Sequence, residues 1–334
     1  MSTRLEVCFM TSVVDIGVGS YRIWIHDLAQ YFNELGIEAS INELPDNIKS
    51  NLVIILGKSD IGQCEHYKKK YPNNIIGIIN PIAGILYSAD FIIVGSIEEK
   101  DSLAKNKNVF IFPLIEGKYR KIMQKTHIDK DRIIIGVHGS YTHLSKFNPH
   151  LKEAIEEFSK DVNILLRVIT NPNAPKWFYG RPKIPNIKIL DWNFKTFSKD
   201  VSSCDIGIVP NIVDNTPIFK TTSRTKGLYK TDYFFRMKNK SNSGRMFVFI
   251  QHGIPVIADL TPSNLHILGS PDNGFAVFSK DGWLNALREL SNAKNRSKIS
   301  RNALLTFNSL YDPIEWAIRL ANNIQEIEKY DTNN

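Results

Sequence analysis

The sequence predicts an α/β protein of two domains, each built on a doubly wound parallel sheet. Short, continuously apolar runs alternate with helix-compatible segments, and such runs are typical of parallel strands that are buried on both faces. The alternation is interrupted once, by a charged stretch at 116–131, and then restarts. The chain has 334 residues, which is enough for two domains of ordinary size.

The first half of the chain alternates predicted strands and helices. An apolar run at 5–10 predicts a strand, and apolar positions at helical spacing predict a helix over 21–35. A second helix is predicted at 98–105. The remaining apolar runs predict four more strands, at 52–56, 75–79, 91–94 and 109–112. We expect residues 1–115 to form the first domain.

The segment 116–131 is predicted as a linker, and the same alternation predicts a second domain over 132–312. Its strands are predicted at 133–137, 164–169, 187–190, 206–209 and 255–258. Its helices are predicted at 150–158, 244–252, 281–291 and 294–308. Residues 211–239 are polar, basic and aromatic without a clear period, which is typical of a binding loop or lid.

The final segment, 313–334, carries a predicted long helix over 313–330. Its apolar side chains, among them Trp316, Leu320 and Ile324, need a partner surface. This helix is therefore a candidate to cross back to the first domain.

Composition indicates the class of partner. The formal net charge is +8, with basic clusters at 68–70, 118–130 and 220–245. Such an excess favours nucleotide phosphates, nucleic acid or an anionic membrane surface. No RNA- or DNA-binding module is recognisable, so we expect no nucleic-acid partner.

The sequence predicts a cytoplasmic protein. No apolar run reaches the roughly 20 residues that cross a bilayer, and the first residues lack the features of a signal peptide. Basic and aromatic residues at 118–125 and 211–239 leave peripheral contact with the inner face of the membrane open. The three cysteines form no CxxC pair and are expected to be buried thiols: Cys8, Cys64 and Cys204.

A glycine-rich loop, Asp15-Ile-Gly-Val-Gly-Ser-Tyr-Arg22, follows the first predicted strand and opens the first helix. Gly17 and Gly19 let the backbone approach a ligand, and the helix N-terminus offers amide N–H groups to anions or sugar hydroxyls. Arg22 stands in the place of the third glycine of a GxGxxG motif, so a dinucleotide site is weakly supported. A tight turn without a ligand is the alternative.

The second predicted domain opens in the same way, with Gly136-Val-His-Gly-Ser-Tyr-Thr-His143 after its first strand. Gly139 and Ser140 would approach a pyrophosphate. His138 and His143 could donate hydrogen bonds to phosphate or sugar oxygens, and a structural or solvated role is the alternative for each.

Two further groups of polar residues flank the last predicted strand of this domain. Lys240, Ser241 and Arg245 come just before an apolar helix, where positive charge would offset the charge that builds on a leaving diphosphate. A basic helix start on the surface is the alternative. The second group is predicted in the loop after strand 255–258, at the edge where open α/β sheets bind ligands: Ser263, Asn264 and His266.

Together these segments resemble the C-terminal half of GT-B-fold glycosyltransferases, which have two Rossmann-like domains facing a central cleft. The resemblance is carried by IGVHGSYTH, ILDWNF, DIGIVPN, KNKSNSGRMFVFIQHGIPVIA and DNGFAVFSKDGWLNAL. It looks closest to bacterial enzymes that build surface polysaccharides such as lipopolysaccharide and capsule. It is more specific over 133–290 than in the first half.

The resemblance implies that a sugar moves from a nucleotide-diphosphate sugar to a saccharide or lipid-linked saccharide acceptor, without a metal or another cofactor. Ser241, between the two basic residues, is taken as one of the donor contacts. The other donor contacts that it implies are Gly17, Gly19, Gly139, Ser140, Lys240, Arg245, Ser263, Asn264 and His266.

One departure from the family leaves the mechanism open. Many retaining members carry two glutamates eight residues apart, and Lys240 and Val248 occupy the matching positions here. An inverting enzyme would instead use a base of the first domain. The candidate catalytic residues are Asp15, Asp60 and His143, with His26 as a weaker one. A nucleotide-sugar epimerase or hydrolase on the same fold and a non-catalytic sugar-nucleotide-binding subunit are the alternatives.

Overall fold

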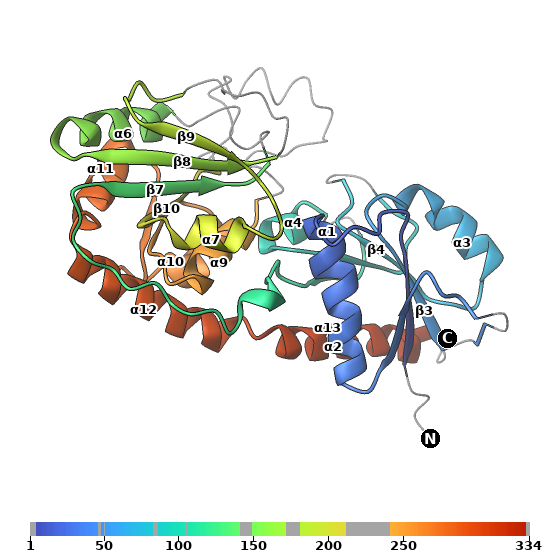
Figure 1. The fold of residues 1–334 in the computed structure, drawn as a ribbon. Coiled ribbons are helices and arrows are strands. Elements are labelled where there is room, and N and C mark those ends of the chain that lie inside the picture. The colour runs from blue at the N-terminus through green and yellow to red at the C-terminus, as the bar shows by residue number, and fades with distance from the viewer. Residues whose placement is uncertain are drawn as a thin grey trace, which may run out of the picture. The chain divides into compact units, whose positions relative to one another are not determined.

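A computed structural model describes residues 5–45, 48–49, 51–82, 86–103, 106–140, 149–171, 181–211 and 241–331 (Figure 1). The chain forms two compact units. One runs to Gly117 and is completed by the C-terminal segment that begins at Tyr311. The other extends from Lys118 to Leu310.

The sheet of the first unit is parallel throughout and has the order β2-β1-β3-β4-β5-β6. Its strands are β1 (Glu6–Met10), β2 (Glu38–Ile41), β3 (Leu52–Leu56), β4 (Ile76–Ile79), β5 (Phe91–Val94) and β6 (Val109–Ile111). Only β2 was not predicted. It is a partly buried edge strand, and its residues lack the continuous apolar run of the central strands.

One long helical segment follows β1. It begins as α1 (Gly19–Tyr21), continues as a π-helix (Arg22–Asp27) and ends as α2 (Leu28–Glu34). The other helices of this unit before its C-terminal segment are α3 (Cys64–Lys70), preceded by a 3₁₀ turn (Ile61–Gln63), and α4 (Ile97–Asp101). The periodicity predicted one helix over 21–35, and the π segment inside it leaves no mark on that pattern.

The C-terminal helix, α13 (Pro313–Asp331), packs against α2 (Figure 1). Ala317, Leu320 and Ile324 are buried in the same apolar core as Phe9 and Phe32. The apolar stripe of this helix therefore finds its partner surface in the first unit.

The second unit has a parallel sheet of the order β12-β11-β10-β7-β8-β9. Its strands are β7 (Ile133–His138), β8 (Ile164–Thr170), β9 (Ile187–Asp191), β10 (Ile206–Val209), β11 (Val256–Asp259) and β12 (Phe275–Val277). Its α-helices are α6 (Pro149–Asp161), α7 (Phe197–Ser202), α9 (Gly244–Gln251), α10 (Pro262–Leu268), α11 (Lys280–Glu289) and α12 (Ala293–Leu310). Strand β12 and helices α7 and α10 were not predicted.

Glycines in two neighbouring strands allow α9 to lie close to the sheet. A Cβ atom at Gly207 of β10 would lie 2.5 Å from the ring of Phe249, and one at Gly136 of β7 would lie 3.2 Å from it. The Phe249 ring fills this space and is fully buried. The close packing fixes the helix against the two strands whose ends form the site described below.

In each sheet there is one point of reversal, where the chain stops adding strands on one side of the first strand and continues on its other side. In the first sheet β1 lies between β2 and β3, and in the second sheet β7 lies between β8 and β10. The loops that leave the two central strands at such a point diverge, which opens space at the carboxyl ends of the strands. Two doubly wound parallel sheets confirm the predicted fold class.

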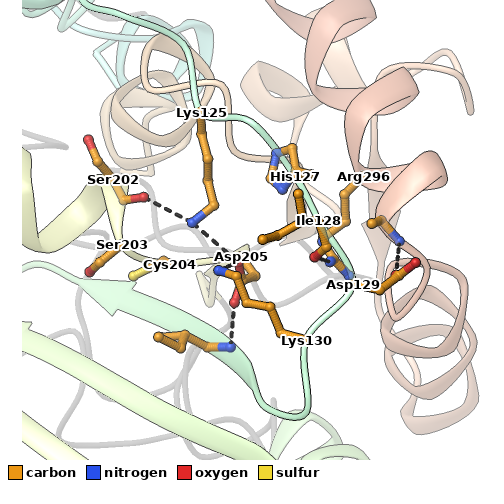
Figure 2. Close-up of polar contacts among 12 residues, drawn as sticks. Lys125, His127, Ile128, Asp129, Lys130, Ser202, Ser203, Cys204, Asp205 and Arg296 are labelled. Atoms are coloured by element: carbon orange, nitrogen blue, oxygen red, sulfur yellow. Dashed lines mark hydrogen bonds and ion pairs between the residues drawn. The ribbon is translucent and has the colours of Figure 1, made fainter.

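The segment predicted as a linker is fastened to the second unit by buried polar contacts (Figure 2). The Asp205 carboxylate accepts bonds from Lys125 at 3.2 Å, from Lys130 at 3.1 Å and from the Ile134 amide at 2.9 Å. Arg296 of α12 donates to the Ile128 carbonyl at 2.9 Å. Although burial opposes it, the Ile134 amide and the two lysines hold the pKa of Asp205 below its usual range.

Candidate functional site

The point of reversal in the first sheet holds a pocket of about 330 Å³. The loop after β1 and the loop after β3 supply most of its walls, and Ile79 at the end of β4 supplies another. The lining residues are Thr11, Val13, Val18, Ser20, Tyr21, Ile25, Lys58, Ser59 and Ile79. This is the edge at which open α/β sheets bind ligands.

Asp60 ties the two loops of this pocket together. Its Oδ2 atom accepts hydrogen bonds from the Ser12 amide at 2.8 Å, the Ser12 hydroxyl at 3.2 Å and the Ser59 hydroxyl at 2.6 Å. The residue is buried. A carboxylate oxygen with three donors positions the two loops, and the role of Asp60 as a catalytic residue stays a prediction.

Asp15 lies at the surface of the same loop. Its Oδ1 atom accepts from the Gly17 amide at 2.8 Å, and its carbonyl oxygen accepts from the Val18 amide at 2.9 Å. These bonds form a turn in which aspartate mimics the backbone. Gly19 then begins the helix. Of the predicted carboxylates, Asp15 is the exposed one.

Arg22 explains why the third glycine of a dinucleotide motif is absent. Its guanidinium is buried, donates to Glu116 at 2.8 and 2.5 Å, and donates to the Ile16 carbonyl at 2.6 Å. The bidentate pair with Glu116 fixes the guanidinium, which in turn holds the loop through the Ile16 carbonyl. Glu116 was missed, because it lies 94 residues away in the chain and no local pattern marks it.

His26, the weaker candidate base, lies on the π-helix. Its Nδ1 atom is 2.9 Å from the Asp27 Oδ1 atom, and its side chain is 35% exposed. Burial raises the pKa of Asp27, although His26 opposes that change. His26 does not line the pocket, whereas its neighbour Tyr21 does.

The second unit has its own site at the point of reversal between β7 and β10. Gly139 follows β7 with a φ of 139°, a conformation that favours glycine, and its amide donates to the Ile169 carbonyl at 3.1 Å. Ser140 follows it. His143 and Lys240 lie outside the described residues.

Arg245, in the first turn of α9, reaches this edge of the sheet. Its Nη2 atom donates to the Pro210 carbonyl at 2.9 Å and to the Asn211 side-chain oxygen, just beyond the end of β10. Its Nη1 atom is buried and has no hydrogen-bond partner among the described residues. Burial lowers the pKa of Arg245 to about 10, with Asp259 opposing, so the side chain stays charged at neutral pH.

A buried polar network holds the loops around Arg245. The Asp259 carboxylate accepts from the Asn211 amide at 2.7 Å, and the Asp259 carbonyl accepts from the Asn264 side chain at 3.0 Å. The Ser243 hydroxyl donates to Asn264 Oδ1 at 3.0 Å, which joins the start of α9 to α10. Ser241, two residues earlier, is also buried. Asp259 and Asn211 were not predicted as site residues.

The segment predicted as a ligand-binding loop after β11 is helix α10. Thr261 caps its N-terminus, with its hydroxyl accepting from the Asn264 amide at 3.4 Å, and Pro262 occupies the first turn. Ser263 and Asn264 are buried on this helix, whereas His266 is exposed. The cap and the proline were visible in the sequence, so the helix could have been predicted.

His138 is not available to a phosphate. Its Nε2 atom donates to the Arg245 carbonyl at 3.1 Å, and its ring packs edge-on against Phe197 and Phe249. Burial, reinforced by the Arg245 charge, lowers the pKa of His138 to about 3. The structural alternative for this histidine is therefore the correct one.

Because the two histidines His127 and His138 are buried, we expect the free energy of unfolding to fall as the pH is lowered. Burial lowers the pKa of His127 to about 4 and that of His138 to about 3, against 6.5 in the unfolded chain. Between pH 6.5 and 4 the unfolded chain binds protons that the folded one does not, so the free energy of unfolding drops as the pH falls. Over this pH interval each histidine contributes at most roughly 3 kcal/mol to the change.

Urea unfolding at pH 7, 6 and 5 measures this dependence. We expect His127→Gln to reduce the slope, and His266→Gln to leave it unchanged, because the His266 side chain is exposed. An equal slope for wild type and His127→Gln would contradict the assignment.

Within the described residues, no three His, Cys, Asp or Glu side chains gather closely enough to hold a metal ion. None of the helices in these ranges combines the length and the apolar character that crossing a bilayer requires. Cys8, Cys64 and Cys204 are buried and free.

The fold is that of GT-B glycosyltransferases. The chain is similar to a glycosyltransferase from Rickettsia africae, with 14% identity, 98% of this chain and 99% of that chain covered, and a TM-score of 0.64. HepE from Anabaena, solved with UDP and glucose, shows 9% identity, 97% and 100% coverage, and a TM-score of 0.62.

A mutant of S. aureus TarM, solved with fondaparinux, α-GlcNAc-glycerol and UDP, shows 11% identity and a TM-score of 0.55. The match covers 89% of this chain but only 58% of TarM, so the chain spans less than two thirds of that protein. No family model and no curated protein matches the sequence.

Proposed function

We propose that the protein is a glycosyltransferase that takes a sugar from a nucleotide-diphosphate sugar held by the second unit. The observation that carries the proposal is the site at the point of reversal between β7 and β10. There the backbone of Gly139 and the charged side chain of Arg245 lie at the same edge of one sheet. Structures with this fold, HepE and TarM among them, have been solved with UDP.

The chemistry requires charge stabilisation on the leaving group. The bond between the anomeric carbon and the diphosphate oxygen breaks while the acceptor oxygen forms its bond to that carbon. Arg245, with a buried guanidinium nitrogen that no described group engages, is suited to the developing negative charge. Lys240 and Ser241 precede the same helix in the chain and complete the proposed diphosphate site with Ser140.

Roles for the residues of α10 follow from burial. Asn264 and Ser263 are buried, and Asn264 is engaged by Asp259 and Ser243, so we assign it to positioning the site. His266 is exposed, and its proposed contact is with the sugar or phosphate. Val248 is buried on α9 at the place where a retaining member would carry a glutamate, which favours the inverting alternative.

The first unit supplies the acceptor site in this proposal. Its pocket lies at the corresponding edge of the other sheet, lined by the loops that Gly17, Gly19 and Asp60 help to shape. An inverting transfer needs a base for the proton of the acceptor hydroxyl. Asp15 is our first choice because it is exposed and Asp60 is engaged by three donors. His26 is the second choice.

Transfer to a saccharide or lipid-linked saccharide without a metal, in the cytoplasm or at the inner face of the membrane, completes the proposal. A thermal-shift screen with UDP, GDP, TDP and CMP tests it. A nucleotide at a hundred times its dissociation constant stabilises by about 2.7 kcal/mol, and we expect one diphosphate to do so while its nucleoside does not. No shift with any nucleotide would overturn the donor site.

The result of this screen also allows the alternative functions to be tested. Once the base is known, the matching nucleotide sugar is incubated with and without saccharide acceptors. Sugar release or isomerisation without an acceptor would identify a hydrolase or an epimerase. Binding without any turnover would identify a non-catalytic sugar-nucleotide-binding subunit.

A further inference from the structure

The loop between β1 and the first helix exposes an unusual amount of apolar surface. Val13, Val14, Ile16 and Val18 lie within six consecutive residues and are 36, 63, 36 and 37% exposed. Single exposed apolar side chains are ordinary, but several together at a concave site are typical of a surface that binds an apolar partner.

This surface continues into the pocket of the first unit. Val13 and Val18 belong both to the exposed loop and to the pocket lining. Deeper in the pocket, Ile25, Ile79 and the ring of Tyr21 add apolar walls. A ligand that extends from the pocket along the loop would therefore contact apolar atoms over its length.

One positively charged side chain lines this pocket, whose other lining residues are apolar or carry a hydroxyl group. Lys58 is exposed and lines the pocket, and it forms no ion pair with any residue that the structure describes. The two nearby carboxylates are already engaged, Asp60 by Ser12 and Ser59 and Asp15 by the Gly17 amide. An unpaired ammonium beside an apolar surface fits an amphiphile with an anionic head.

We propose that the acceptor is carried on an anionic lipid, with its phosphate at Lys58 and its hydrocarbon chain along Val13, Val14, Ile16 and Val18. The inference rests on the proposed function in taking this pocket as the acceptor site. It selects the lipid-linked acceptor over the free saccharide.

Isothermal titration of the full chain with monomeric dodecyl phosphate, below its micellar concentration, tests the proposal. Dodecyl maltoside has the same hydrocarbon chain without the negative charge, and inorganic phosphate has the negative charge without a hydrocarbon chain. We expect dodecyl phosphate to bind at least tenfold more tightly than either, because only it contacts both the ammonium and the apolar loop.

Variants separate the two contributions. We expect Lys58→Ala to weaken dodecyl phosphate at least tenfold and to leave dodecyl maltoside unchanged. The double variant Val14→Ser with Ile16→Ser should weaken both amphiphiles. Met123→Ser, at an apolar residue that is 89% exposed in the other unit, is the matched control and should change neither.

Equal binding of the three probes, or loss with Met123→Ser as large as with the loop variants, would overturn the proposal. So would binding to vesicles of anionic phospholipid without binding to monomeric dodecyl phosphate, since this would indicate a membrane contact rather than a lipid site. Nucleotide binding in the thermal-shift screen is measured independently, so the donor proposal can survive the failure of this one.

Discussion

Arg245→Ala is expected to weaken binding of the nucleotide diphosphate by roughly 10- to 100-fold, since a hydrogen bond to a charged group contributes about 1.5–3 kcal/mol. The guanidinium reaches the carboxyl end of β10, and one of its nitrogens is buried without a described partner. Turnover should fall further than affinity, because the charge on the leaving diphosphate is greatest in the transition state. Titration calorimetry and steady-state kinetics measure the two effects.

The side chain also contacts Pro210 and Asn211, so a loss of structure must be distinguished from a loss of ligand contact. The unfolding midpoint of each variant is measured without nucleotide. Arg245→Lys keeps the charge but not the planar fork, and we expect it to recover part of the affinity. Arg288→Ala, at an exposed arginine of the same unit, should bind like wild type. Unchanged affinity and turnover in Arg245→Ala would refute the diphosphate site.

Asp205→Ala is expected to lower the free energy of unfolding by about 3–5 kcal/mol, the cost of removing one partner from a buried ion pair. Asp205 is 1% exposed, and its removal leaves Lys130 and the Ile134 amide without this acceptor, while Lys125 keeps its bond to the Ser202 carbonyl at 3.0 Å (Figure 2). Because Lys125 and Lys130 belong to the segment before β7, we expect that segment to loosen first. Urea unfolding gives the energy, and hydrogen exchange at 118–132 gives the location.

Asp272→Ala is the matched control in the same unit. Asp272 pairs with Lys298, and both side chains are about 60% exposed, so the loss should stay below about 1 kcal/mol. Asp205→Asn keeps the shape of the side chain and removes its charge, and should fall between the two. A similar effect for Asp205→Ala and Asp272→Ala would show that the buried carboxylate does not fasten the segment.

Local pattern was sufficient for most strands of both sheets, including the edge strands β6 and β9, and missed the edge strands β2 and β12. The central strands of both units are apolar on both faces, so continuous runs such as 52–56 and 206–209 matched the strands to the residue. Strand β2 and the short helix α7 lack such runs, whereas β12 was missed although residues 275–278 are continuously apolar. Helix α10 was missed although its cap and proline signal a helix start.

The candidate site, too, could be predicted from the sequence only in part. Glycine loops after β1 and β7, and the arginine that opens α9, could be placed from the order of strands and helices along the chain. The partners that determine each side chain's role could not. Asp60 is engaged by Ser12 and Ser59, and His138 by the Arg245 carbonyl. Such contacts join residues up to 107 positions apart, and no local spacing encodes them.

The sequence by itself determined that the chain alternates buried strands and helices in two series, and that glycine and basic residues follow particular strands. These properties depend on neighbouring residues, through burial periodicity and backbone conformation. Only the tertiary structure decided which polar groups are engaged and which remain for a ligand. That depends on strand order, because a reversal beside β1 and beside β7 brings loops from distant parts of the chain to one edge of a sheet.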